Sequence, residues 1–259
     1  MSISGGPKGG TVADGKEPDC KDLEKKNIDA RAFFIANGPK PKVKREDRPK
    51  KKNGNLANKT PWELADGSGM TYSTGYYRTE PDASGITQTY SSNKTADKYI
   101  NGAGLGGTGA QRVGLNETIR NSPPDQHTDA KRKAGTLCNF RRVHLGGGYG
   151  GHAECKIFND LTNHVKGALR DGSVLLSIDW RPENRQTGAT EYHGTPCSTC
   201  YDMLCEAANE CNIEIWICDH QNKPQPMSKS DCKKPDGYPK LVKLINGHAK
   251  GGRLKAPGT

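Results

Sequence analysis

The order of the elements predicted in the second half of the chain constrains its fold most strongly. Two short strand-like stretches, "TLCNF" and "RRVHL" (136–145), precede a glycine-rich entry to a helix, "GGGYGG" (146–151). The hydrophobic strand "SVLLSIDW" (173–180) follows, and after a second helix comes the strand "IEIWIC" (213–218). This alternation predicts an α/β fold in which helices pack on a sheet.

The two helices are predicted from apolar periodicity and from their end signals. The first ends at Gly172, and its apolar side chains recur every four residues at Ala153, Ile157, Leu161, Val165 and Leu169. The second helix is expected to begin with Thr195 as N-cap and Pro196 at the first helical position. It runs through Met203, Leu204, Ala207 and Ala208, and a further short helix is expected around residues 239–249.

The first part of the chain, up to about residue 110, has few aliphatic side chains and much Gly, Lys, Asn, Thr and Pro. Hydrophobic residues make up 32% of the 259 residues, and the mean hydropathy of -0.87 is poor for one compact core of that length. We therefore predict a basic, poorly structured leader over residues 1–110, which serves delivery or linkage, and a separate folded domain over residues 111–259. Within the leader, "YSTGYYRTE" and "GITQTYSS" are expected to form a β hairpin.

The charge is concentrated near the N-terminus. The chain carries +10, and residues 1–60 contribute 15 basic minus 8 acidic side chains, or +7. The run "KPKVKREDRPKKK" (40–52) is suited to contact nucleic acid or an anionic surface, although a solvated flexible segment explains it equally well. The stretch "MSISGGPKGG" lacks the apolar region of a Sec signal peptide, and no apolar run is long enough to span a membrane.

The nine cysteines are an odd number, which favours reduced thiols and a metal site over a disulfide framework. Cys197 and Cys200 stand at i and i+3 in the first turn of a helix, where they share a face and where thiolates are favoured. Such a pair can chelate one zinc ion and leaves two tetrahedral positions open. His152, at the start of the other helix, is the candidate third ligand, which leaves the last position for water.

Glu154 follows His152 by two residues, and on a regular helix this spacing points the two side chains apart. In a first helical turn that faces a cavity, however, both side chains can project into the cavity. We therefore expect His152 on the metal and Glu154 beside the water.

These residues carry a resemblance to a known family. His152-Ala153-Glu154 and Pro196-Cys197-Ser198-Thr199-Cys200 match the H-x-E and P-C-x-x-C signature of the zinc-dependent cytidine deaminase superfamily, and the likeness covers about residues 135–245. It implies a three-layer sandwich with a mixed sheet and helices on both faces. It also implies that His152, Cys197 and Cys200 hold Zn²⁺, which activates a water to attack the amino-bearing ring carbon. Glu154 then moves protons from that water to the base and to the departing ammonia.

The superfamily signature does not choose the substrate, but the basic chain and its long extension favour a polymer. In the loop before the cysteines, Arg181, Tyr192 and His193 are the candidate residues that contact a phosphate and stack on a base. We therefore expect conversion of cytosine to uracil in nucleic acid, with DNA favoured over RNA. A deaminase of free nucleosides or nucleotides is the alternative.

The arrangement of a basic leader before a deaminase domain also resembles bacterial polymorphic toxins. The resemblance implies export without a Sec signal by a specialised secretion system, action in the cytoplasm of a target cell, and a cognate immunity protein. A fragment that begins near Ala110 is then expected to keep its full catalytic rate.

Three other interpretations of the cysteine pair remain open. Cys197 and Cys200 could complete a structural zinc knuckle with Cys218 and His220, or with Cys205 and Cys211. A thioredoxin-like redox pair is a further possibility, although that motif normally follows the first strand of its fold. Finally, the zinc could stabilise a nucleic-acid-binding module in which Glu154 is incidental and no catalysis occurs.

Overall fold

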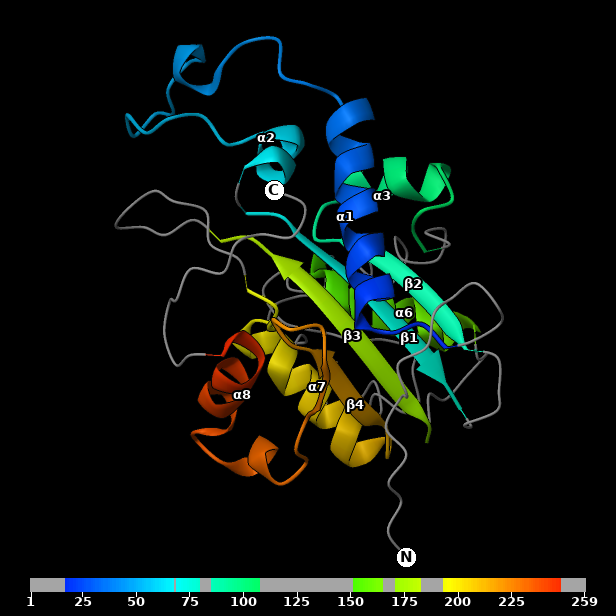
Figure 1. The fold of residues 1–259 in the computed structure, drawn as a ribbon. Coiled ribbons are helices and arrows are strands. Elements are labelled where there is room, and N and C mark those ends of the chain that lie inside the picture. The colour runs from blue at the N-terminus through cyan, green and yellow to red at the C-terminus, as the bar shows by residue number, and fades with distance from the viewer. Residues whose placement is uncertain are drawn as a thin grey trace, which may run out of the picture.

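A five-stranded mixed sheet forms the centre of the molecule (Figure 1). The computed structural model describes residues 17–67, 69–79, 85–107, 151–164, 171–182 and 193–247. The strands lie in the order β2-β1-β3-β4-β5. Their bounds are β1 Thr71–Arg78, β2 Ile86–Ser91, β3 Ser173–Trp180, β4 Glu214–Cys218 and β5 Pro224–Pro226.

The connectivity of the sheet combines a hairpin with a parallel crossover. β1 pairs antiparallel with β2 on one side and with β3 on the other. β3 and β4 are parallel, and the helix α7 (Ser198–Glu210) connects them. Because parallel strands need such a crossover helix, the start of α7 lies at the end of the sheet where β3 ends.

Helices cover both faces of the sheet, so the fold has three layers. The side chains of β3 alternate between the faces. Leu175 packs in a cluster with Leu23 of α1 (Cys20–Asn37), and Ser177 accepts hydrogen bonds from Asn27 of the same helix. Leu176 on the opposite face belongs to a larger core that includes side chains of α6 (Ala153–His164), α7 and α8 (Gly237–Asn246).

The larger core brings α6 close to the middle of the sheet. Gly75, in β1, faces this helix, and a Cβ atom placed there would lie 2.7 Å from Cγ2 of Ile157 and 3.1 Å from Cδ2 of Leu176. A side chain at this position would therefore push α6 away from the sheet. Gly75 therefore allows α6, which carries candidate site residues, to pack close to the sheet.

Several predicted elements are confirmed. β3 has the predicted bounds, "YSTGYYRTE" and "GITQTYSS" contain the paired strands β1 and β2, and α8 lies where the short C-terminal helix was expected. The apolar positions 153, 157 and 161 of α6 are buried, whereas Val165, Leu169 and the predicted strands at 136–145 lie outside the described residues. The predicted N-cap at Thr195 is wrong, because α7 begins two residues later with Cys197 as its N-cap.

The prediction that residues 1–110 are poorly structured is wrong for the residues that the structure describes from position 17 onward. This part supplies α1, β1 and β2, together with the helices α2 (Pro61–Asp66) and α3 (Lys94–Gly102). β1 lies in the interior of the sheet, so the strands on both sides of the predicted boundary at residue 110 share one sheet. The proposed role of this part in delivery stays a prediction.

The prediction of reduced thiols is also wrong. Cys20 in α1 forms a disulfide with Cys218 at the end of β4, and Cys205 in α7 forms one with Cys232 in the short 3₁₀ helix η5 (Asp231–Lys233). Cys211 is disulfide-bonded as well. Among the described residues, only Cys155, Cys197 and Cys200 are free thiols. The disulfides thus leave the two cysteines of the P-C-x-x-C motif available.

The Cys20–Cys218 disulfide is expected to contribute more to stability than the Cys205–Cys232 disulfide. The two cross-links span 198 and 27 residues, respectively. A longer closed loop removes more entropy from the unfolded chain, which corresponds to about 5 kcal/mol for the first and about 3.5 kcal/mol for the second. Denaturant unfolding of the two paired Cys→Ala variants, each compared with the unchanged protein, measures both losses. A larger loss for the shorter cross-link would contradict this expectation.

Candidate metal centre

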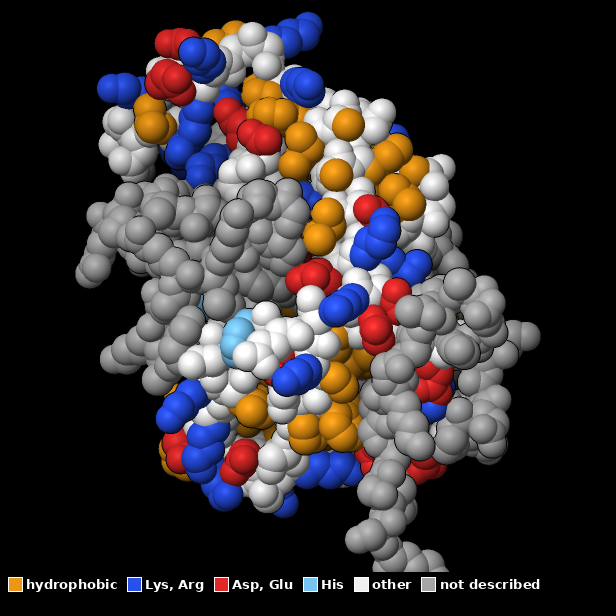
Figure 2. Space-filling model, viewed as in Figure 1, with side chains coloured by type: hydrophobic (Ala, Val, Ile, Leu, Met, Phe, Trp, Pro, Cys, Tyr) orange, Lys and Arg blue, Asp and Glu red, His pale blue; other side chains and the backbone are white. Residues whose placement is uncertain are grey.

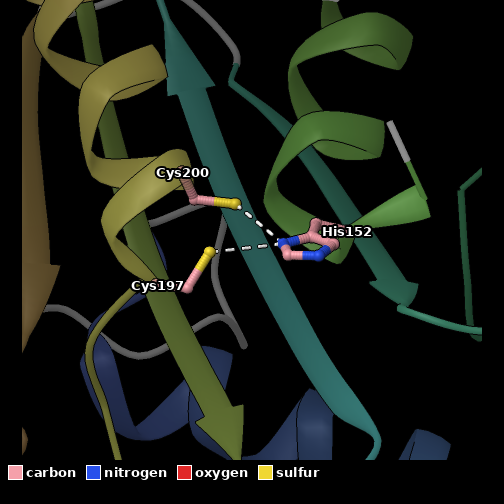
Figure 3. A group of neighbouring side chains, drawn as sticks. All are labelled: His152, Cys197 and Cys200. Carbon is pink, nitrogen blue, oxygen red and sulfur yellow. Dashed lines mark hydrogen bonds between the residues drawn. The ribbon is translucent and has the colours of Figure 1, made fainter. Parts of the chain in front are cut away.

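The starts of α6 and α7 meet above the sheet, and each brings metal-binding side chains to the meeting point (Figure 3). His152 immediately precedes α6. Cys197 is the N-cap of α7, and Cys200 lies in its first turn. The sulfur of Cys197 faces the ring of His152.

The three side chains present a compact donor set. Nδ1 of His152 lies 3.3 Å from Sγ of Cys200 and 3.4 Å from Sγ of Cys197. All three donor atoms lie within 4.8 Å of one another. A tetrahedral zinc ion with ordinary bond lengths separates its nitrogen and sulfur ligands by about 3.5 Å. The donor chemistry and the spacing therefore fit a divalent zinc ion with few adjustments.

The close contact of the two thiols moves their pKa values in opposite directions. Cys200 donates a hydrogen bond that, together with His152, lowers the pKa of Cys197 to about 4. The same pairing, reinforced by burial, raises the pKa of Cys200. The hydrogen bond with Cys197 also raises the pKa of His152. A divalent cation at this point would be bound by two thiolates and a neutral imidazole.

Glu154 lies beside this donor set, as the sequence predicted. Its side chain is 3% exposed, and its Oε2 lies 3.7 Å from Sγ of Cys200. Burial raises the pKa of this carboxyl group, because the charged form loses its water. A carboxyl group with a raised pKa next to a metal position is suited to accept and return a proton.

The N-terminal half of the chain fixes the position of α6. The ammonium group of Lys156 is buried, and it donates to Oδ2 of Asp97 in α3 and to the backbone oxygen of Ser91 in β2, each at 2.7 Å. One turn further along α6, Asp160 accepts a hydrogen bond of 2.5 Å from the hydroxyl of Tyr90. These contacts anchor the helix close to His152 and Glu154. Sequence reasoning missed them, although a lysine between apolar positions of a helix was a signal for a buried ion pair.

Helix α8 holds the segment that leads into α7. The hydroxyl of Tyr238 donates to the backbone oxygen of Pro196 at 3.0 Å. Asn246 accepts from the backbone N–H of Gly194 at 3.1 Å, and its Nδ2 lies 3.3 Å from Nδ1 of His193. Residues at both ends of α8 thus hydrogen-bond to the backbone immediately before Cys197. These contacts fix the position of the two sulfur ligands.

The three predicted substrate contacts have different outcomes. Arg181 is 8% exposed, and its guanidinium donates to both carboxylate oxygens of Asp179, at 2.8 and 3.0 Å. His193 is half-buried and pairs through its backbone with Trp180, and the two rings are 5.5 Å apart. Tyr192 lies outside the described residues. His193 precedes the first sulfur ligand by four residues in the sequence, whereas Arg181 is engaged within the fold.

A structural zinc knuckle is excluded, because the additional cysteines that it would need as ligands are in disulfides. Cys218, Cys205 and Cys211 are all disulfide-bonded, so their sulfurs are not available as thiolate ligands. His152, Cys197 and Cys200 are the group that could hold a metal within the part of the chain that the structure describes. Three protein ligands with one open position are typical of a catalytic zinc site rather than a structural one.

Zinc binding is expected to depend on each of the three ligands but not on the neighbouring free thiol. We expect His152→Ala and Cys200→Ala to lose zinc during dialysis, since two ligands hold the ion far less tightly than three. Cys155→Ala is the matched control, because Cys155 is also a buried free thiol but lies outside the metal-binding group. Elemental analysis of the purified variants measures the result, and equal zinc loss from the Cys155 variant would contradict the assignment.

Comparison with known proteins identifies no relative of this chain. No protein-family model, no curated protein and no solved structure matches the chain. The interpretation of the metal centre accordingly rests on its own residues and geometry. In addition, no helix of the described residues is long and apolar enough to cross a membrane.

Proposed function

We propose that this protein is a zinc-dependent hydrolytic deaminase that converts cytosine to uracil in nucleic acid. The observation that carries the proposal is the convergence of His152, Cys197 and Cys200 around one point, with the buried carboxyl group of Glu154 beside them. These four residues form the H-x-E and P-C-x-x-C signature in the sequence. The mixed sheet with helices on both faces agrees with the fold that this resemblance implies.

His152, Cys197 and Cys200 would hold the zinc ion. When bound, zinc supplies Lewis-acid activation of a water at neutral pH. The two sulfurs and one imidazole nitrogen fill three of four tetrahedral positions, so the fourth is left for that water. The disulfides elsewhere in the chain leave both sulfur ligands free to bind the metal.

Glu154 would carry the protons of the reaction. Its buried carboxylate accepts a proton as water attacks the ring carbon, and the resulting acid donates that proton to the ring nitrogen. Glu154 then takes the remaining proton of the added hydroxyl group and delivers it to the exocyclic amine, so that the carbon–nitrogen bond breaks and ammonia leaves as the carbonyl forms. One carboxyl group that moves protons in both directions answers the chemical difficulty of the step, because an aromatic amine is a poor leaving group until it is protonated.

The disulfides support a function outside the compartment of synthesis. Disulfides persist mainly in oxidising environments and are rare in cytosolic proteins. The Cys20–Cys218 and Cys205–Cys232 cross-links therefore agree with an exported effector, as the resemblance to polymorphic toxins implies. An immunity protein that blocks the site, and action inside a target cell, belong to the same proposal.

A non-catalytic zinc module is the alternative from a different class. It requires the same three ligands, but it assigns no role to the burial of Glu154. Placing a carboxyl group in an apolar site disfavours its charged form, and a purely structural metal site gains nothing from such a group. The position of Glu154 beside Cys200 therefore favours the enzyme.

The experiment that tests the proposed function compares four substrates with the zinc-loaded protein. Single-stranded DNA, duplex DNA, RNA and free cytidine are incubated in parallel, and ammonia release and uracil formation are measured. Uracil that appears only in a polymer supports the proposal. Conversion of free cytidine alone would instead indicate a nucleoside deaminase, and no conversion of any substrate would favour the non-catalytic zinc module.

A further inference from the structure

A folded basic arm connects α1 with α2. We define the basic arm as residues 40–59, which include the 3₁₀ helix η2 (Arg45–Asp47). It holds nine basic and two acidic side chains, a net charge of +7 out of +10 for the whole chain. Figure 2 shows Lys and Arg side chains gathered over this region at the upper left of the molecule. The basic excess is therefore localised on one protruding segment.

The arm has a defined conformation that its arginines maintain. Nε of Arg45 donates to the backbone oxygen of Ala57 at 2.7 Å, and Arg48 donates to the backbone oxygen of Asn58 at 3.1 Å. Arg48 also forms an ion pair with Glu63 in α2. These contacts join the outgoing and returning halves of the arm. A turn closed by hydrogen bonds between Lys51 and residues 54 and 55 forms its tip.

The lysines of the arm, in contrast, face solvent. The exposed members are Lys40, Lys42, Lys44, Lys50, Lys51 and Lys52. In the part of the chain that the structure describes, none of these six forms an ion pair, although Lys40 lies 5.8 Å from the ring centre of Trp62. Holding six like charges on one short segment is unfavourable by itself, and an anionic partner would remove that repulsion.

The two helices that flank the arm are joined to the end of β3 from which the chain continues toward the metal ligands. Arg31 of α1 donates to the backbone oxygens of Ala65 in α2 and of Met70, and it also binds the buried carboxylate of Asp179 in β3. The next residue of β3, Trp180, pairs with His193, four residues before Cys197. The helices that flank the arm and the segment that leads into α7 therefore contact the same end of β3.

We propose that the basic arm binds the phosphate backbone of a single-stranded nucleic acid and guides the strand toward the metal centre. Exposed lysines act as point charges that attract phosphates without recognising the base sequence. Sequence-independent binding of nucleic acid requires such contacts. That the bound strand is also the substrate rests on the proposed function. The contact of the arm with nucleic acid is independent of the proposed function.

Binding and its salt dependence test the arm directly. The variant replaces the six exposed lysines by glutamine in a Glu154→Gln background, so that the oligonucleotide is not consumed. The control replaces six exposed lysines elsewhere and so changes the net charge equally: Lys21, Lys94, Lys98, Lys223, Lys233 and Lys243. The probe is a fluorescently labelled single-stranded oligonucleotide, and anisotropy gives its Kd at several salt concentrations.

We expect the arm variant to bind about 100-fold more weakly or worse at low salt, whereas the control loses less than about 10-fold. If the arm neutralises about four phosphates, the slope of log K against log salt concentration falls by about 3. Equal losses for the arm and control variants would overturn the proposal. So would binding of the arm to anionic lipid vesicles in place of the oligonucleotide.

Turnover separates failure of this inference from failure of the proposed function. With Glu154 intact, the arm variant should lose kcat/KM on the oligonucleotide and keep its rate on free cytidine, if cytidine is accepted. A protein that binds the oligonucleotide through the arm and deaminates nothing would retain this inference and refute the proposed function. If the protein deaminates the oligonucleotide but its arm and control variants bind equally, the proposed function is retained and the role of the arm is refuted.

Discussion

Replacement of Glu154 by glutamine is expected to lower the rate of deamination about 1,000-fold, or roughly 4 kcal/mol of transition-state stabilisation, with zinc content unchanged. Glutamine has nearly the same shape as glutamate but cannot accept and return a proton. The carboxyl group is buried and contacts Cys200 of the metal-binding group, so an amide can occupy its place without opening the fold. The rate of uracil formation and the zinc content are measured on the same preparation.

Glu214→Gln is the matched control for this experiment, because Glu214 is an exposed carboxylate at the start of β4. Its rate should equal that of the unchanged protein. If the Glu154 variant retained its activity, the proton-transfer role would be refuted. If that variant lost its zinc together with its activity, Glu154 would act as a metal ligand or as a structural support instead.

A fragment of residues 111–259 is expected to fail to fold, even though the sequence alone predicted that such a fragment keeps its catalytic rate. The missing part includes β1, which pairs with β3 along its whole length. Without β1, β3 has an unpaired edge and α6 loses the surface on which Ile157 packs. The fragment also lacks Asp97, which leaves the buried ammonium of Lys156 without its counterion.

Circular dichroism during denaturant titration and uracil formation measure the outcome of this truncation. The fragment should show no cooperative transition and no activity, whereas a fragment of residues 17–259 should match the full chain, because it keeps every described element. A folded and active 111–259 fragment would show that the first half is a separable leader. It would also contradict the positioning role of the contacts between α6 and β2.

The contrast between the two halves explains what the sequence could predict. "SVLLSIDW" is a continuous aliphatic run, and it forms a strand with the predicted bounds. The strands β1 and β2 instead build their buried positions from Tyr, Thr, Ser and Gly, which aliphatic counting treats as solvent-exposed. Tyr72, Tyr77 and Tyr90 are at most 2% exposed. Their burial depends on partners distant in sequence, so the sequence indicated a hairpin here but not that this hairpin belongs to the central sheet.

Polar partners within the core had the same effect on prediction. Thr74 and Thr89 share a hydrogen bond of 2.8 Å across the hairpin, and Thr74 also donates to Asn27 of α1. Such networks allow hydrophilic residues to be buried, but only the assembled structure shows which groups are paired. The disulfide between Cys20 and Cys218 is a further example, since its two cysteines are 198 residues apart in the sequence.

The candidate site was more accessible to prediction than the fold around it. The donor types and their positions at helix starts indicated His152, Cys197 and Cys200 as one group, and the structure brings them together. Arg181 was assigned to substrate because it follows the strand in a polar loop. The signal for its actual partner was Asp179, two residues earlier on the same face of an extended strand, with which Arg181 forms a buried ion pair.

The central claim is that His152, Cys197 and Cys200 bind one zinc ion on which deamination depends, and a zinc titration of the metal-free protein tests it most directly. Zinc is added in steps to the chelator-treated chain, and bound metal and uracil formation on single-stranded DNA are measured at each step. We expect activity to rise in proportion to bound zinc and to saturate at about one ion per chain. Full zinc occupancy without activity on any cytosine-containing substrate, or activity that is independent of zinc, would contradict it.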